Sequence, residues 1–182
     1  MKSTLKNILI ISCIALFSNT LFAKGLTLSS TDMKGQMTEN QVFKGFGCQG
    51  KNISPQLSWK NVPKGTKSFA ITMYDPDAPT GSGWWHWVVF DIPSNTNELI
   101  SNASKLNNLP KGTIQGKSDY GSNEFGGSCP PKGDGFHTYV TTVYALDVKT
   151  LGLNKNTSSA VVGYMLNQHT VEKSSIVTYY QR

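Results

Sequence analysis

The chain has 182 residues, a formal net charge of +6, and 38% hydrophobic and 15% charged residues. This length is ordinary for one domain with a sizeable core, and no internal repeat or long low-complexity linker interrupts the sequence. The lysines occur singly and form no tract, so the sequence lacks the clustered positive charge that is typical of nucleic-acid-binding proteins. We therefore expect no nucleic-acid partner.

Residues 1–23 have the layout of a cleavable secretory signal. Lys2 and Lys6 precede an apolar stretch over residues 8–22, and Ala23 ends it before a polar start. The stretch is short for a membrane span, and an uncleaved anchor is the alternative interpretation. We predict a signal peptide over 1–23 and a single domain over 24–182, periplasmic or secreted, with a net charge of +4 and at most peripheral membrane contact.

Two cysteines, Cys48 and Cys129, remain once residues 1–23 are removed. In an oxidising export compartment, two otherwise unexplained cysteines are a candidate disulfide. The bridge would join the loop at residues 46–50 to the segment 126–139. Two buried free thiols are the alternative.

The hydrophobic pattern of the mature chain is dominated by strands. Strand candidates, in chain order, are 26–29, 56–59, 68–74, 87–92, 138–146 and 176–180. Only 158–168 has a helical pattern, with Thr157, Ser158 or Ser159 as its N-cap. Many short strands with turn-rich connections predict an all-β fold, an antiparallel β-sandwich with one or two short helices.

Two segments almost fifty residues apart hold two of the three histidines among prolines, glycines and aromatic residues. The first, 74–87, contains Asp75 and His86; the second, 126–139, contains Gly127, His137 and Tyr139. The titratable groups stand where strands end, which is where a rigid scaffold presents binding groups. We predict one small anion pocket, with ring N–H groups, the phenol and backbone N–H groups near 127 and 129 as donors.

A carboxylate at Asp75 would lie beside the bound anion and carry the same sign of charge. It repels the guest unless it raises the charge on a histidine or shares a proton with the guest. We therefore expect affinity for phosphate groups to rise as the pH falls through the histidine range. Asp77 is expected to bind its own turn and His169 to be structural, assisting the last helix carbonyls. Ala78–Pro79 and Pro130–Pro131 are candidate cis peptides.

At these residues the sequence resembles a known family. The segment 75–79 (Asp-Pro-Asp-Ala-Pro), the Trp-His-Trp around His86 and the Pro-Pro-Lys-Gly before 136–139 are similar to signature motifs of the phosphatidylethanolamine-binding protein (PEBP) family, in its bacterial Raf kinase inhibitor-like branch. The resemblance extends to 53–59 and 162–166. Thr138 stands where the family motif often has an arginine.

The resemblance implies a large antiparallel β-sandwich with a small pocket at one end that binds phosphate-like groups. The ligand-binding residues that it implies are Asp75, His86, Gly127, Pro130, His137 and Tyr139. We expect a non-enzymatic binding protein with no cofactor and no metal, and with a phosphorylated small molecule, lipid head group or partner segment as its ligand. Through this ligand it could modulate another protein. The kinase-inhibitor label does not transfer to an exported protein.

Two other function classes stay open. One is a protein–protein inhibitor or interaction module whose pocket is vestigial. The other is an enzyme, either metal-dependent through Asp75, His86 and His137 or a hydrolase that uses Ser128, although no Gly-x-Ser-x-Gly motif is present.

Overall fold

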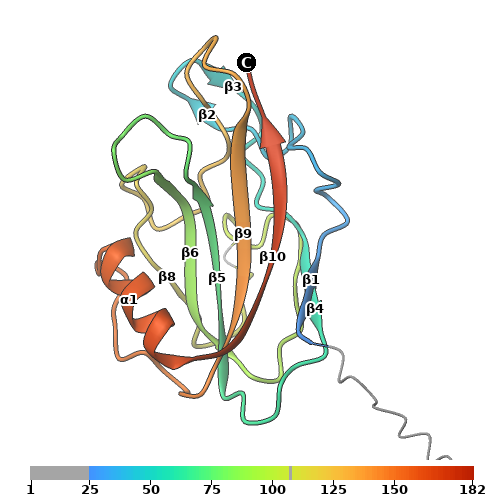
Figure 1. Cartoon of the computed structure of the whole chain (residues 1–182), viewed down its shortest axis with the longest axis vertical. Coiled ribbons are helices and arrows are strands. Elements are labelled where there is room, and N and C mark those ends of the chain that lie inside the picture. The colour runs from blue at the N-terminus through green and yellow to red at the C-terminus, as the bar shows by residue number, and fades with distance from the viewer. Residues whose placement is uncertain (1–24, 107) are drawn as a thin grey trace, which may run out of the picture.

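The structure, a computed structural model, describes residues 25–106 and 108–182 and is built on antiparallel sheets (Figure 1). The main sheet has the strand order β10 (Thr170–Tyr180), β9 (His137–Leu146), β5 (Ser68–Asp75), β6 (Trp84–Pro93), β8 (Ile114–Gln115). The second sheet has the order β1 (Thr27–Ser29), β4 (Leu57–Lys60), β7 (Glu98–Leu99). The strands β2 (Lys44–Gly45) and β3 (Cys48–Gln49) form a separate two-stranded antiparallel hairpin.

The centre of the main sheet is buried on both faces. Phe69 and Ile71 of β5 pack with Trp59 of β4 in the core between the two sheets. Ala70 of β5 points the other way and packs with Val162 of the helix. Because alternate side chains of a strand point to opposite faces, a strand covered on both sides has an almost unbroken buried run.

The single helix among the described residues, α1 (Ser159–His169), covers the outer face of the main sheet (Figure 1). The Ser158 side chain accepts a hydrogen bond from the Val161 amide, as expected of an N-cap. Val162 and Leu166 form the buried stripe, whereas Val161 is exposed. The predicted sandwich with a short helix is confirmed.

Three details differ from the sequence predictions. β6 and β10 begin earlier than predicted, at Trp84 and Thr170, because pairing with β5 and β9 continues beyond the apolar runs. The proposed cis peptides at Ala78–Pro79 and Pro130–Pro131 are wrong, since the described residues contain no cis peptide bond. His169 Nδ1 lies 3.0 Å from Asp147 Oδ1, so this ring contacts a carboxylate rather than the last helix carbonyls.

The predicted signal segment, residues 1–23, lies outside the described residues. Within 25–106 and 108–182, no helix combines the length and the apolar character needed to cross a membrane.

The predicted Cys48–Cys129 disulfide is present in the structure. It joins residues separated by 81 positions and ties the β2–β3 hairpin to the loop before β9. Closing so long a loop restricts the unfolded chain strongly, which is the main source of disulfide stabilisation in the chain-entropy model.

We expect the Cys48→Ser, Cys129→Ser double variant to lose about 4.5 kcal/mol of unfolding free energy, the value that this model gives for such a loop. Urea denaturation of the mature protein measures the loss. Adding reductant should bring the wild type to the midpoint of the variant and leave the variant unchanged. Equal midpoints for oxidised and reduced wild type would contradict the prediction.

Candidate ligand-binding site

Three strand ends meet at one end of the main sheet. β5 ends at Asp75, β6 begins two residues before His86, and β9 begins at His137. Antiparallel pairing of β5 with both neighbours brings the last residue of β5 beside the first residues of β6 and β9. The sheet topology thus gathers the two predicted segments at one place.

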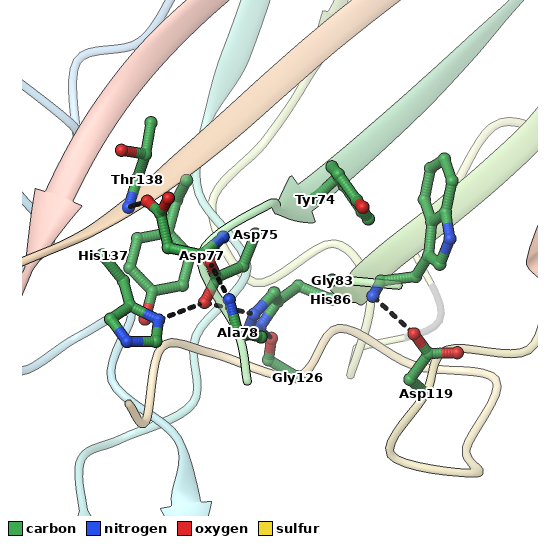
Figure 2. Close-up of polar contacts among 12 residues, drawn as sticks. Tyr74, Asp75, Asp77, Ala78, Gly83, His86, Asp119, Gly126, His137 and Thr138 are labelled. Atoms are coloured by element: carbon green, nitrogen blue, oxygen red, sulfur yellow. Dashed lines mark hydrogen bonds and ion pairs between the residues drawn. The ribbon is translucent and has the colours of Figure 1, made fainter. Parts of the chain in front are cut away.

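The Asp75 carboxylate lies between the two predicted histidines (Figure 2). His137 Nδ1 lies 2.8 Å from Asp75 Oδ2, and His86 Nε2 lies 4.0 Å from the same oxygen. All three side chains are almost completely buried. The second oxygen, Oδ1, accepts hydrogen bonds from the amides of Asp77 and Ala78, so the carboxylate is held by the turn that follows β5.

His137 contacts carboxylates through both ring nitrogens. Its Nε2 lies 3.2 Å from Asp134 Oδ2, in addition to the contact of Nδ1 with Asp75. Burial opposes the charged ring, but hydrogen bonds to the two carboxylates outweigh it and raise the pKa of His137 above its ordinary value. The doubly protonated ring can donate to both partners, and it offsets the charge that Asp75 brings into the site.

His86 has the opposite environment. Its Nδ1 lies 2.8 Å from the Gly126 carbonyl oxygen and 3.1 Å from that of Gly127, and carbonyls only accept, so Nδ1 carries a proton. Burial lowers the pKa of His86 despite these carbonyls and Asp75. The neutral ring therefore presents an unprotonated Nε2, and this buried atom has no hydrogen-bond partner in the described residues.

Two phenols complete the floor of the site. Burial, followed by the charge of Asp75, raises the pKa of both Tyr139 and Tyr120, so both hydroxyls keep their protons. The Tyr120 hydroxyl donates to the Gly127 carbonyl, whereas the buried Tyr139 hydroxyl has no partner among the described residues. The Tyr120 ring packs directly on Gly126, where any side chain would collide with it.

These groups line a recess of about 200 Å³. Its lining residues are Phe46, Asp75, Ala78, Pro79, Thr80, Trp84, His86, Tyr120, Cys129, Pro130, Pro131, His137 and Tyr139. Pockets that enclose drug-sized ligands measure roughly 300–1,000 Å³, so this recess suits a small polar group whose remainder stays outside. A larger, open groove between 109–115 and 153–155 is lined by no histidine or acidic residue. The buried titratable groups that converge on the recess favour it over the groove as the ligand-binding site.

Five of the six predicted ligand-binding residues line this recess, and the sixth does not. The exception is Gly127, whose carbonyl contacts His86 and whose amide donates to Asn52 Oδ1. Its N–H is therefore not available for the predicted anion cradle. Asp77 was expected to bind its own turn but accepts a hydrogen bond from the Thr138 amide, while Asp75 holds that turn.

Sequence analysis missed three residues of the site. Tyr120 and Phe46 belong to loops without a recognisable motif and enter the recess only through tertiary packing. Asp134 could have been found, because it lies three residues before His137 in a glycine-rich turn. Within residues 25–106 and 108–182, no group of three or more His, Cys, Asp or Glu is arranged to hold a metal ion.

The two histidines should titrate on opposite sides of their ordinary pKa of about 6.5, His137 above it and His86 below it. NMR titration of the ring signals measures both midpoints. Asp134→Asn should lower the His137 midpoint and move that of His86 much less, because Asp134 contacts only His137. Midpoints in the reverse order would contradict this assignment.

The raised pKa also fixes the sign of the stability effect. The His137–carboxylate contacts contribute fully below the unfolded-state pKa of about 6.5, and the contribution is lost as the pH rises through the folded-state pKa. The stability advantage of the wild type over Asp134→Asn should therefore shrink with rising pH.

Comparisons with known proteins agree with this architecture. The model of the family described as phosphatidylethanolamine-binding protein matches residues 33–181. Protein YbcL of Escherichia coli is 44% identical over 181 residues, which cover 97% of this chain and 99% of YbcL. Protein YbhB of the same organism is 42% identical over 158 residues, which cover 85% of this chain and 99% of YbhB.

Solved structures agree as well. The crystal structure of E. coli YbcL, described as a new member of the mammalian PEBP family, matches with a TM-score of 0.85 and 47% identity over 87% of this chain and 99% of that chain. A PEBP homologue of Chlamydia trachomatis, with a TM-score of 0.72 and 24% identity over 87% and 98% of the two chains, shares the fold. The chain therefore belongs to the phosphatidylethanolamine-binding protein family.

Proposed function

We propose that this protein is a non-enzymatic binding protein whose recess holds a phosphate-like group. One observation carries the proposal: His86 Nε2 and the Tyr139 hydroxyl are both buried, both belong to lining residues, and neither has a hydrogen-bond partner in the described residues. Leaving a buried polar group unpaired is costly. A bound phosphate could accept a hydrogen bond from the Tyr139 hydroxyl and share a proton with His86 Nε2, which would pair both atoms.

The charges around the recess restrict the form in which a phosphate binds. Among the described residues that line it, none is a lysine or arginine, and Asp75 is a carboxylate. His86 Nε2 can contact an anion favourably only if it gains a proton or if the guest supplies one. The site thus suits a phosphate monoanion, or the phosphate of a zwitterionic head group, better than a naked dianion.

The likeness to phosphatidylethanolamine-binding proteins supports a phosphorylated head group as one guest. A phosphorylated small molecule or a phosphorylated segment of a partner protein presents the same group. Binding of such a segment is the route by which the protein would modulate another protein. We place this activity outside the cytoplasm, on the evidence of the signal-like segment at residues 1–23.

Burial supports the absence of catalysis through Ser128. The Ser128 side chain is completely buried, and it is not among the lining residues of the recess. A serine nucleophile must reach its substrate and lie within hydrogen-bond distance of a base, but its hydroxyl has no partner in the described residues.

Tyr139→Phe should weaken binding of inorganic phosphate by about tenfold or more, the cost of one hydrogen bond to a charged group. The same change should leave the ligand-free protein equally or more stable, because this hydroxyl has no partner in the described residues. Calorimetry and thermal unfolding measure the two effects. Tyr164→Phe, an exposed position on α1, is the matched control and should change neither. Unchanged affinity in Tyr139→Phe would show that the Tyr139 hydroxyl does not contact the bound phosphate.

Affinity for sulfate, which stays a dianion, should rise as the pH falls from about 8 to 5, since His86 must be protonated to donate to it. Calorimetry in two buffers with different ionisation enthalpies should show proton uptake on binding. A pH-independent affinity would contradict the role given to His86.

A further inference from the structure

An aromatic side chain at the mouth of the recess is held in an unfavourable conformation. Phe46 and Gly47 form the two-residue loop of the β2–β3 hairpin, and both have positive φ, 51° and 81°. Loops of this kind favour Asn, Asp or Gly, and a bulky residue at positive φ is an outlier. The Phe46 side chain is also 70% exposed. A residue that costs both backbone strain and apolar exposure points to a function.

The hairpin is fastened to the opposite side of the recess by two long-range contacts. One is the Cys48–Cys129 disulfide, directly beside the loop. The other is Arg182, whose Nε donates to the Pro130 carbonyl at 2.6 Å and whose Nη2 donates to the Phe46 carbonyl at 3.3 Å. The guanidinium passes so close to Gly47 that an added Cβ would lie 3.3 Å from Nη1. Arg182 thus bridges two lining residues of the recess.

The Phe46 ring continues an aromatic wall that reaches the floor of the site. It lies 5.7 Å from Tyr120 with an interplanar angle of 29°, and the Tyr120 ring lies 5.6 Å from His86. Two further exposed lining residues, Pro79 and Pro131, are also apolar. A guest that fills a recess of about 200 Å³ with its phosphate must place the group bonded to that phosphate against this rim.

We propose that Phe46 is the specificity-determining residue of this recess, selecting organic phosphate esters with an apolar substituent over inorganic phosphate, and that Arg182 positions it. This inference rests on the proposed phosphate-binding function. Apolar contact with an aromatic ring favours the ester, whereas the free ion offers the rim no surface to cover. The ester can come from a lipid head group or from a soluble metabolite.

The test compares phenyl phosphate with inorganic phosphate by calorimetry on the mature, disulfide-bonded protein. The wild type should prefer the ester by about tenfold, the gain expected from one aromatic contact. Phe46→Asn should bring this ratio close to one. Because Asn suits positive φ, the variant should unfold at the same temperature or higher. Loss of preference without loss of stability separates a role in specificity from a role in folding.

A double-mutant cycle tests the positioning role of Arg182. Arg182→Met should reduce the ester preference in the wild-type background and have no further effect in Phe46→Asn, since it acts through that ring. Tyr164→Asn, which removes an exposed aromatic ring far along the chain on α1, is the control and should keep the wild-type ratio.

The outcomes distinguish this inference from the proposed function. Binding of inorganic phosphate with no ester preference, or a preference that survives Phe46→Asn, overturns the specificity role alone. Absence of binding to either ligand overturns both proposals. A soluble short-chain phosphatidylethanolamine is the third titrant: both esters should lose affinity in Phe46→Asn, and the tighter of the two in the wild type identifies the source of the ligand.

Discussion

The buried contact between Asp75 and His137 is the interaction on which the site depends. A carboxylate taken out of water is costly unless it is paired and hydrogen-bonded, and here one oxygen binds the imidazole while the other binds two turn amides. This pairing balances charge inside the protein. His86 differs, because its Nδ1 faces carbonyls and its buried Nε2 has no partner in the described residues.

The scaffold makes this arrangement possible because the main sheet cannot easily deform. β5 is buried on both faces and paired along its length with β6 and β9, so the positions of Asp75, His86 and His137 follow from strand register. A rigid sheet can hold unpaired polar atoms in place, although each costs stability. Asp75, His86, His137 and Tyr139 belong to strands of the main sheet, whereas Tyr120 and Phe46 come from loops.

Loops bring further residues to the recess that the strand register does not place there. Tyr120 supports the Gly127 carbonyl that orients His86, and the β2–β3 hairpin brings Phe46 to the mouth. The disulfide and Arg182, which donates to the carbonyls of Pro130 and Phe46, tie this hairpin to the loop before β9. Membership of the PEBP family accounts for the sheet architecture.

The sequence by itself determined the main strands and the helix, because alternation and helical spacing are local properties of the chain. It predicted the disulfide for another reason, since only two cysteines remain outside the predicted signal segment. The structure selected Ser158 from the three candidate N-caps. The sequence also identified the two segments that form the recess. Only the tertiary structure decided the partner of each ring nitrogen, the role of Asp75 in its turn, and the contributions of Tyr120, Phe46 and Arg182. These contacts join residues from 2 to 136 positions apart, and most depend on where strands and loops come together in space, which no local pattern records.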